Sequence, residues 1–165
     1  MTVTTGSGAV LVDGAGGALA VETSSSAVTL RRVASSLRVR TQSGAVNAAL
    51  AGQGDVDVVT GSSAIRLSGV RGGATVATQS GRITIDGSPT REWALTTGSS
   101  NVEVNLERAA ALQLDAASGS STNVRVVHPA FKGTSEKGRI SGAIGIGGPP
   151  VRITTRSGQI HVQGS

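Results

Sequence analysis

One short motif recurs along most of this 165-residue sequence and constrains its fold more than any other feature. It reads apolar-x-Thr-x-Ser-Gly/Ser-x-Val/Ile-x-apolar. The clear copies are VTTGSGAVLV, VETSSSAVTL, VRTQSGAVNA, VVTGSSAIRL, VATQSGRITI, LTTGSSNVEV and ITTRSGQIHV, starting at Val3, Val21, Val39, Val58, Val76, Leu95 and Ile153. A repeat of this length is typical of a solenoid, in which each turn packs only on its neighbours.

The spacing of the motif threonines predicts how many turns the chain makes. The steps between them are nearly constant along the first part of the chain, where they stand at Thr5, Thr23, Thr41, Thr60, Thr78 and Thr97. The next regular one is Thr155, three further steps along. The interval before it holds two weaker copies of the motif, LDAASGSS from Leu114 and SEKGRI with Ser135 at the Thr position. We therefore predict about nine turns of about 18 to 20 residues.

Within each repeat apolar and polar residues alternate, which is the period of a half-buried strand. The alternation predicts three columns of inward side chains: Leu19, Leu37, Val56, Ala74, Trp93, Leu112 and Val151; then Val21, Val39, Val58, Val76, Leu95, Leu114 and Ile153; and, after the Ser-Gly corner, Val10, Val28, Val46, Ile65, Ile83, Val102, Ile140 and Ile160. Each turn thus contributes two short strands. The predicted fold is an all-β, single parallel β-solenoid (β-helix), for which we expect a right-handed coil although the repeat does not itself fix the hand.

The corners between strands explain the abundance of Gly and Ser, because a chain that reverses direction needs residues that tolerate positive φ or bond their own backbone. The motif threonines alternate with the inward residues, so their hydroxyls are expected inside, near the corner. There they can bond to one another or to corner carbonyls, which offsets the cost of burying them. We interpret the threonine column as structural.

Two segments depart from the repeat. Residues Asn105 to Ala117 have a helix-like composition, yet Leu112 and Leu114 fall in register with the inward columns, so we predict a strand turn there. Residues 127–138 are polar and contain Pro129, which favours a loop excursion. The whole chain, 1–165, is predicted to be one domain.

Composition excludes several classes of protein. With one Trp, one Phe and no Tyr, the chain cannot present the aromatic platforms that stack sugars or single-stranded nucleic acid. With no Cys, it has no disulfide, thiolate nucleophile or Cys-ligated metal. No apolar run approaches the ~20 residues that span a bilayer, and no charged-then-apolar leader precedes Thr2, so no transmembrane segment or signal peptide is expected in this sequence.

The net charge of +5 is weak evidence for a polyanionic partner. The arginines are scattered from Arg31 to Arg156, whereas nucleic-acid binders usually concentrate their charge on one face or in one arm. Two interpretations stay open, a solvated surface and an anion-binding surface, and no specific nucleic acid is expected.

The sequence predicts no catalytic residues, no cofactor-binding residues and no metal ligands. Only Asp55 and Asp57 are neighbouring acids, and Arg38 sits one turn away where it can pair with Asp57 across the ladder. His128 and His161 have no matching acid spacing, and we place His128 in the loop and His161 on the surface. Parallel β-solenoid enzymes that cut acidic polysaccharides need a carboxylate cluster, often with calcium, which this pattern does not supply.

Two further patterns suggest ligands but are better explained by the fold. Trp93 could stack a ligand, yet it falls in an inward column and is predicted to fill the core. Regular outward threonines suggest an ice-binding face, but charges such as Glu22, Arg40 and Arg66 interrupt both outward ranks.

The repeats TQSGAV, TQSGRI and TRSGQI and the closing pattern GRISGAIGIGGPPVRITTRSGQIHV give the chain its family resemblance. It resembles a bacterial adhesin-like family of unknown function whose members are described as β-strand-repeat proteins. The resemblance spans nearly all of the chain and implies an envelope-associated or secreted scaffold with an adhesive role. It carries over no catalytic residue.

The leading hypothesis is a non-catalytic structural or interaction module with a cell-surface or polyanionic partner. The alternative is a self-assembling filament protein like the bactofilins, and a polysaccharide-active β-helix enzyme is a third hypothesis. The first repeat begins at Val3 and the last closes at Val162, so we expect no cap at either end of the rod. Either flanking segments of a longer chain cover the two edges, or rods associate end to end.

Overall fold

The structure is a computed structural model that describes residues 1–119 and 124–164, and in these ranges it contains strands and no helix. The strands are β1 (Thr2–Thr5), β2 (Val10–Ala15), β3 (Leu19–Thr23), β4 (Val28–Val33), β5 (Leu37–Thr41), β6 (Val46–Leu50), β7 (Val56–Thr60), β8 (Ile65–Val70), β9 (Ala74–Thr78), β10 (Ile83–Gly87), β11 (Trp93–Thr97), β12 (Val102–Leu106), β13 (Leu112–Ser118), β14 (Val124–Val127), β15 (Phe131–Glu136), β16 (Arg139–Ile144), β17 (Pro150–Thr155) and β18 (Ile160–Gly164). The predicted all-β class is confirmed.

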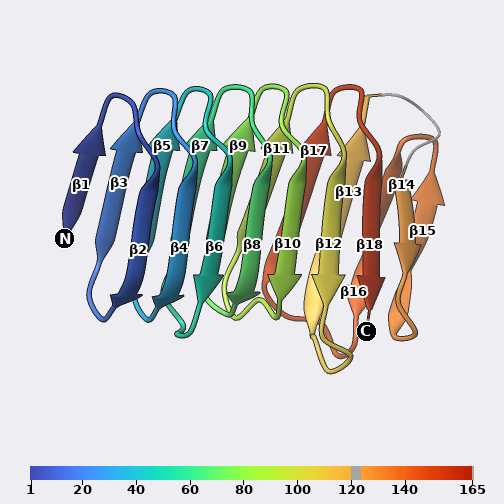
Figure 1. Ribbon diagram of the computed structural model, residues 1–165. Coiled ribbons are helices and arrows are strands. Elements are labelled where there is room, and N and C mark those ends of the chain that lie inside the picture. The colour runs from blue at the N-terminus through green and yellow to red at the C-terminus, as the bar shows by residue number, and fades with distance from the viewer. Residues whose placement is uncertain (120–123, 165) are drawn as a thin grey trace.

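The strands form two facing sheets. Sheet A has ten strands in the order β1-β3-β5-β7-β9-β11-β17-β13-β16-β15, and sheet B has eight in the order β2-β4-β6-β8-β10-β12-β18-β14. In the first six turns the chain rises through sheet A at the rear of Figure 1 and descends through sheet B in front as it advances, which is a right-handed coil. Neighbouring turns pair in parallel, as predicted for the solenoid.

The core between the sheets is aliphatic and follows the predicted columns closely in these six turns. Val21, Val39 and Val58 are adjacent in sheet A, and each is fully buried. Ile65 and Ile83 face them from sheet B and are equally buried. Because no turn can cover its own apolar side, the stack of turns is the folding unit.

The last turn of the chain does not lie at the end of the rod. Strand β17 pairs with β11 on one side and β13 on the other, and β18 lies likewise between β12 and β14 (Figure 1). The described rod therefore has eight two-stranded turns, and the predicted nine turns are wrong. The nearly regular motif of β17 matches β11 well, since Val151, Ile153 and Thr155 meet Trp93, Leu95 and Thr97.

The turn that contains β13 is displaced by two residues from its predicted register. Leu114 lies beside Val151 and Ala116 beside Ile153, whereas the columns had placed Leu112 and Leu114 there. Ser118 takes the corner position, and its hydroxyl donates a hydrogen bond of 3.0 Å to the carbonyl oxygen of Gly158. The segment is a strand, as predicted. The last residues of the LDAASGSS copy, 120 and 121, lie outside the described residues.

The predicted loop at 127–138 and the predicted SEKGRI turn are both wrong, because this region forms the antiparallel hairpin β15–β16. The hairpin extends sheet A beyond β13. Ile140 consequently lies beside Ala116 in sheet A, and Val124 takes the expected place next to Ile160 in sheet B. The polar residues that suggested a loop form the exposed edge strand β15. The expectation that this end has no cap is therefore wrong for sheet A, where the hairpin covers β13, while β14 is the edge strand of sheet B.

The predicted inward threonines are buried except Thr5, which is half-buried, and they occur in two alternating kinds of corner. Thr41, Thr78 and Thr155 are followed three residues later by Gly, whose N–H donates to the threonine Oγ1 at 2.9 to 3.1 Å. Thr23, Thr60 and Thr97 are followed by Ser, and their Oγ1 atoms have no hydrogen-bond partner. The structural role predicted for the column is thus confirmed in half of these corners.

The Gly corners are also the tightest contacts between turns. A Cβ atom on Gly44, Gly81 or Gly158 would lie 1.6, 1.7 or 1.9 Å from the carbonyl oxygen of the corner serine in the adjacent turn. No side chain fits at such a distance, so these positions require glycine for close approach.

The core register can be tested with two substitutions to Asp. Val76 is 1% exposed, and Val76→Asp should lower the free energy of unfolding by about 3 kcal/mol or more, because an unpaired carboxylate would be buried among aliphatic side chains. Arg82 is exposed, and Arg82→Asp should stay within ~0.5 kcal/mol of the parent. Denaturant unfolding gives both values, and equal stabilities would contradict the register.

The close approach of turns can be tested at a single corner. Gly44→Ala should destabilise the protein by about 1–3 kcal/mol, because the added methyl group overlaps the carbonyl oxygen of Ser26. Ser43→Ala places the same side chain at the neighbouring exposed position and should have little effect. A thermal melt in which the two variants coincide would show that the turns are not packed this tightly.

Candidate functional site

A shallow groove of about 750 Å³ crosses sheet A where its first strands begin. Its charged lining comes from Arg38, Asp55, Asp57, Arg91 and Glu92. The groove contains Asp55 and Asp57, the only neighbouring acids in the sequence, so it is the candidate site for chemistry.

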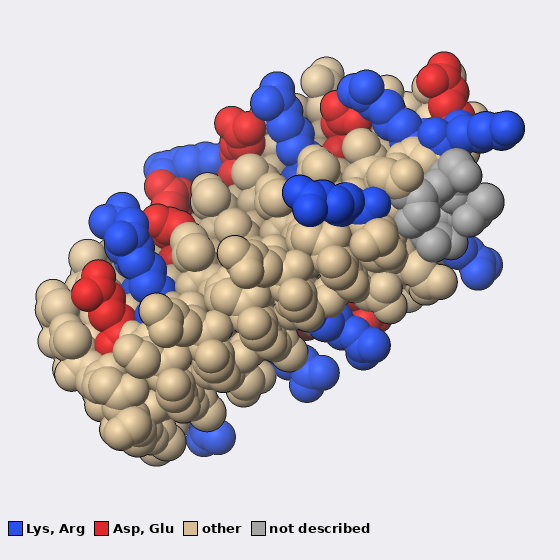
Figure 2. Space-filling model, turned by 90° about the horizontal axis from the view of Figure 1, so that it is seen from above, with Lys and Arg blue, Asp and Glu red and all other residues tan. Residues whose placement is uncertain are grey.

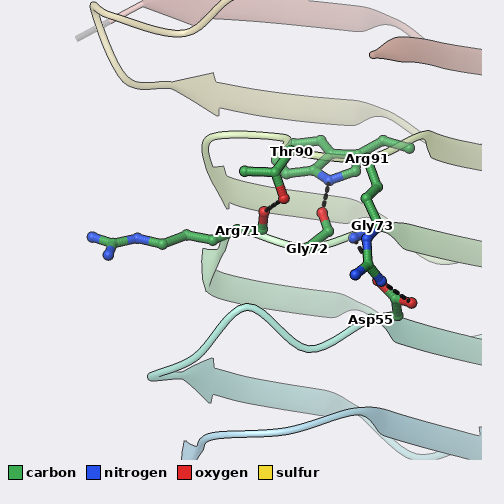
Figure 3. Close-up of polar contacts among 7 residues, drawn as sticks. Asp55, Arg71, Gly72, Gly73, Thr90 and Arg91 are labelled. Atoms are coloured by element: carbon green, nitrogen blue, oxygen red, sulfur yellow. Dashed lines mark hydrogen bonds and ion pairs between the residues drawn. The ribbon is translucent and has the colours of Figure 1, made fainter. Parts of the chain in front are cut away.

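Asp55 is held by groups from the next two turns (Figure 3). Its Oδ1 accepts a hydrogen bond of 2.9 Å from the N–H of Gly73, and Nη1 of Arg91 lies 2.8 Å from Oδ2. Arg91 is 36 residues away and reaches Asp55 across the intervening turn. It can do so because Gly73 has no side chain, and a Cβ there would lie 3.1 Å from Asp55 Oδ1.

Asp57 makes the ion pair that the sequence predicts. Arg38 and Asp57 are directly opposite in β5 and β7, and Arg38 Nε lies 3.3 Å from Asp57 Oδ2. Both side chains are substantially exposed, so the pair contributes little to stability. Each aspartate in the groove therefore already has a cationic partner.

Trp93 lies behind the groove, in the core position that the sequence predicts. Its side chain is fully buried, and Nε1 donates a 2.8 Å hydrogen bond to the carbonyl oxygen of Gly72 (Figure 3). Ala74, its neighbour in β9, leaves room for the indole ring. Thr90 stabilises the same corner, because its hydroxyl donates a hydrogen bond to the carbonyl oxygen of Arg71.

The two histidines do not approach one another in a common site. His128 lies in the connection between β14 and β15, as predicted, but it is only 8% exposed, and its Nδ1 accepts the N–H of Ala130 at 3.1 Å. His161 lies on the outer side of sheet B, between Glu103 and Arg125. Within residues 1–119 and 124–164, no group of three or more His, Cys, Asp or Glu side chains is placed to hold a metal ion.

A ladder of amide side chains on sheet B was not anticipated from the sequence. Asn105 donates to Asp86, and Gln163 donates to Asn105, so one chain of hydrogen bonds crosses β10, β12 and β18. The sequence gives no sign of the second bond, because Asn105 and Gln163 are 58 residues apart and meet only through the intercalated last turn.

Charge is distributed along the rod and not concentrated on one face. Seen from above in Figure 2, positive and negative side chains lie mostly along the long edges, and the surface between them is nearly uncharged. The arginines for which the described residues provide no ion pair come from both sheets and both rows of corners: Arg31, Arg40, Arg66, Arg71, Arg82, Arg108, Arg125, Arg152 and Arg156.

One ion pair joins the hairpin β15–β16 to the rest of the rod. Arg139 of β16 donates to Asp115 of β13 through Nε at 3.0 Å and Nη2 at 2.8 Å. These hydrogen bonds, together with the negative charge of Asp115, raise the pKa of Arg139.

A family model described as Toastrack DUF4097 matches residues 1–163. The chain belongs to this family. The match covers the solenoid and its hairpin, so the Toastrack domain accounts for nearly the whole chain.

The family is of the repeat type expected from the sequence, and its model carries no activity or adhesive role. No curated protein and no solved structure matches this Toastrack domain. Among its described residues there is no helix with the length and apolarity needed to cross a membrane.

The groove can be tested by comparing its buried and exposed interactions. Trp93→Phe removes the bond to Gly72 and leaves a buried carbonyl unpaired, which should cost about 1–3 kcal/mol. Asp55→Asn weakens an exposed ion pair and should cost less than about 1 kcal/mol. Denaturant melts should rank the two variants in this order. A larger loss for Asp55→Asn would show that the charged groove, and not the indole, holds this corner together.

Proposed function

We propose that this Toastrack domain is a non-catalytic, rod-shaped interaction module of the bacterial cell envelope, with an adhesin-like role. The observation that carries the proposal is that both aspartates of the groove are engaged by arginines, Asp55 by Arg91 at 2.8 Å and Asp57 by Arg38 at 3.3 Å. Oxygen atoms that already accept these bonds are poorly available to a substrate or a calcium ion.

The shape of the domain supports a binding role. Two sheets of outward side chains run along the rod, and eight turns at ~4.8 Å each give a length of about 40 Å. Repeat proteins use such extended surfaces to contact long partners through many weak interactions.

The charge distribution favours a polyanionic partner over a neutral one. Arg40 and Arg152 project from sheet A, and Arg31 and Arg66 from sheet B, all exposed and without a carboxylate partner in the described residues. Exposed guanidinium groups bind carboxylates and phosphates in bidentate fashion, and an envelope polysaccharide rich in such groups supplies them repeatedly.

The proposal can be tested on immobilised polysaccharides. The purified chain should be retained on alginate or pectate but not on neutral dextran, and retention should weaken as salt rises because exposed charges are screened. Arg40→Gln with Arg152→Gln tests sheet A, and Arg31→Gln with Arg66→Gln tests sheet B. Loss of retention in one pair identifies the binding face, and equal retention on dextran would contradict a polyanionic partner.

The same incubations test the absence of catalysis. With pectin, alginate or peptidoglycan fragments, with and without calcium, no new reducing or unsaturated ends should form. Turnover that disappears in Asp57→Asn, but persists in Asp13→Asn outside the groove, would show that the domain is an enzyme.

A further inference from the structure

The outer face of sheet B carries a β-bulge that places two arginines side by side. In β4, Arg31 and Arg32 together stand opposite one residue of β6, Ala49. Both arginines are exposed, because the bulge turns two consecutive side chains to the same face. Figure 1 shows β4, β6 and β8 side by side in the front sheet, with further turns on either side of them.

Arg32 has a strained backbone conformation. Within residues 1–119 and 124–164 it is the only non-Gly residue with a positive φ, which is 53°. Gly14 of β2 and Gly69 of β8 occupy the same bulge position with φ of 82° and 71°, which glycine adopts without the steric penalty of a side chain. The ion pair of Arg32 with Asp13 is exposed and returns less free energy than the strain costs. The fold thus gives no reason for an arginine here, and such strain persists mainly where a side chain has a function.

The two guanidinium groups of the bulge keep donors free for a ligand. Asp13 Oδ1 lies 2.8 Å from Nε and 2.7 Å from Nη2 of Arg32, so this carboxylate occupies one edge of the guanidinium. Nη1 of Arg32 has no partner among the described residues, and Arg31 forms no ion pair with any of them. One carboxylate therefore faces two cations, which leaves a net positive charge at the bulge.

The neighbouring strands add further donors around the small side chain of Ala49. Ser68 of β8 faces Ala49 directly, on the side of β6 away from the bulge. Arg66 precedes Ser68 by two residues on the same outer face, and it also lacks an ion pair with a described residue. The outward side chains of β4, β6 and β8 include no carboxylate: they are Thr29, Arg31, Arg32, Asn47, Ala49, Arg66 and Ser68.

The carboxylates that border this area are already engaged. Asp13 is bound by Arg32, and Asp86 of β10 accepts a hydrogen bond from Asn105. The outer face of β4, β6 and β8 thus combines guanidinium, hydroxyl and amide donors with no free carboxylate. Guanidinium groups bind oxyanions in bidentate fashion, and hydroxyl and amide groups donate to the remaining oxygen lone pairs.

We propose that the outer face of β4, β6 and β8 is an oxyanion site, in which the anion lies above Ala49 and is held by Arg31, Arg32 and Arg66. The ligand class is a carboxylate-bearing polysaccharide, so this inference rests on the proposed function and places its contact on sheet B. Arg31 and Arg66 lie on opposite sides of β6, and the methyl group of Ala49 lets one anion approach both. The site is a flat surface, which a polymer can follow across several turns.

Sheet A offers no equivalent group of arginines. Its Arg38 is paired with Asp57, and Arg40 and Arg152 lie on β5 and β17, with β7, β9 and β11 between them. The positive φ of Arg32 also has no counterpart among the described residues of sheet A. The strained residue and the unpaired arginines therefore coincide on sheet B alone.

Calorimetric titration of the full chain with an alginate oligosaccharide tests the site. Ala49→Asp should weaken binding at least ~10-fold, because its carboxylate would take the place of the ligand and repel it. Ala77→Asp is the matched control, since Ala77 is a half-buried, outward alanine of sheet A between Val59 and Thr96. It makes the same charge change and should alter the affinity less than ~2-fold. Equal losses in the two variants would overturn the site.

Arg32→Gly separates a binding role from a structural one. Glycine relieves the strain at φ 53°, so the Tm should equal or exceed that of the parent, while affinity for the oligosaccharide should fall about 3-fold. Arg40→Gln removes one positive charge from sheet A and should leave the affinity unchanged. A lower Tm with unchanged affinity would show that Arg32 serves only its ion pair with Asp13, which overturns its role in the site.

A second titration with inorganic sulfate, followed by NMR, distinguishes failure of the site from failure of the proposed function. Sulfate should shift the side-chain signals of Arg31, Arg32 and Arg66 in the parent and not in Ala49→Asp. If alginate binds but Ala49→Asp binds it equally well, the site is wrong and the polyanion-binding function stands. If alginate does not bind but sulfate gives these shifts, the site stands and its ligand is a small oxyanion. If neither binds, the site is overturned.

Discussion

Parallel hydrogen bonding between successive turns, in one fixed register, is the constraint on which the rest of this structure depends. Each inner strand donates and accepts on both sides, so its position along the strand direction is set by its neighbours. A shift of one residue would turn every inward side chain outward. The nearly constant length of the repeat preserves this register through six consecutive turns, from β1–β2 to β11–β12.

The polar features of the domain are consequences of this register. Arg38 meets Asp57, and Asp86 meets Asn105, because their strands are adjacent and their residues directly opposite. Arg91 reaches Asp55 over Gly73, since one missing side chain opens a path across a turn. These interactions occupy both aspartates of the groove, which is why the function we propose is binding and not catalysis.

The order of turns in space has a further consequence for the two ends. Insertion of β17–β18 between β11–β12 and β13–β14 places the C-terminal strands inside the rod and leaves the irregular segment outermost. That segment folds back as the hairpin β15–β16, which Arg139 fastens to Asp115. Sheet A is thereby extended by an irregular, charged hairpin, with β15 as its edge strand and β14 as the edge strand of sheet B.

The sequence alone determined the strand period, the inward columns of the first six turns, the burial of the threonines and of Trp93, and the pairing of Arg38 with Asp57. These properties are local or repeat every turn, so periodicity is sufficient to predict them. Only the tertiary structure decided the place of the last turn, the two-residue shift of β13, and the hairpin that replaces the predicted loop and ninth turn. The physical reason is that β17 can pair with any turn of matching register, and its match to β11 through Val151, Ile153 and Thr155 overrides its position in the chain. Sequence distance therefore ceases to measure spatial distance after Leu106, and the bond between Asn105 and Gln163 could not be predicted without the fold.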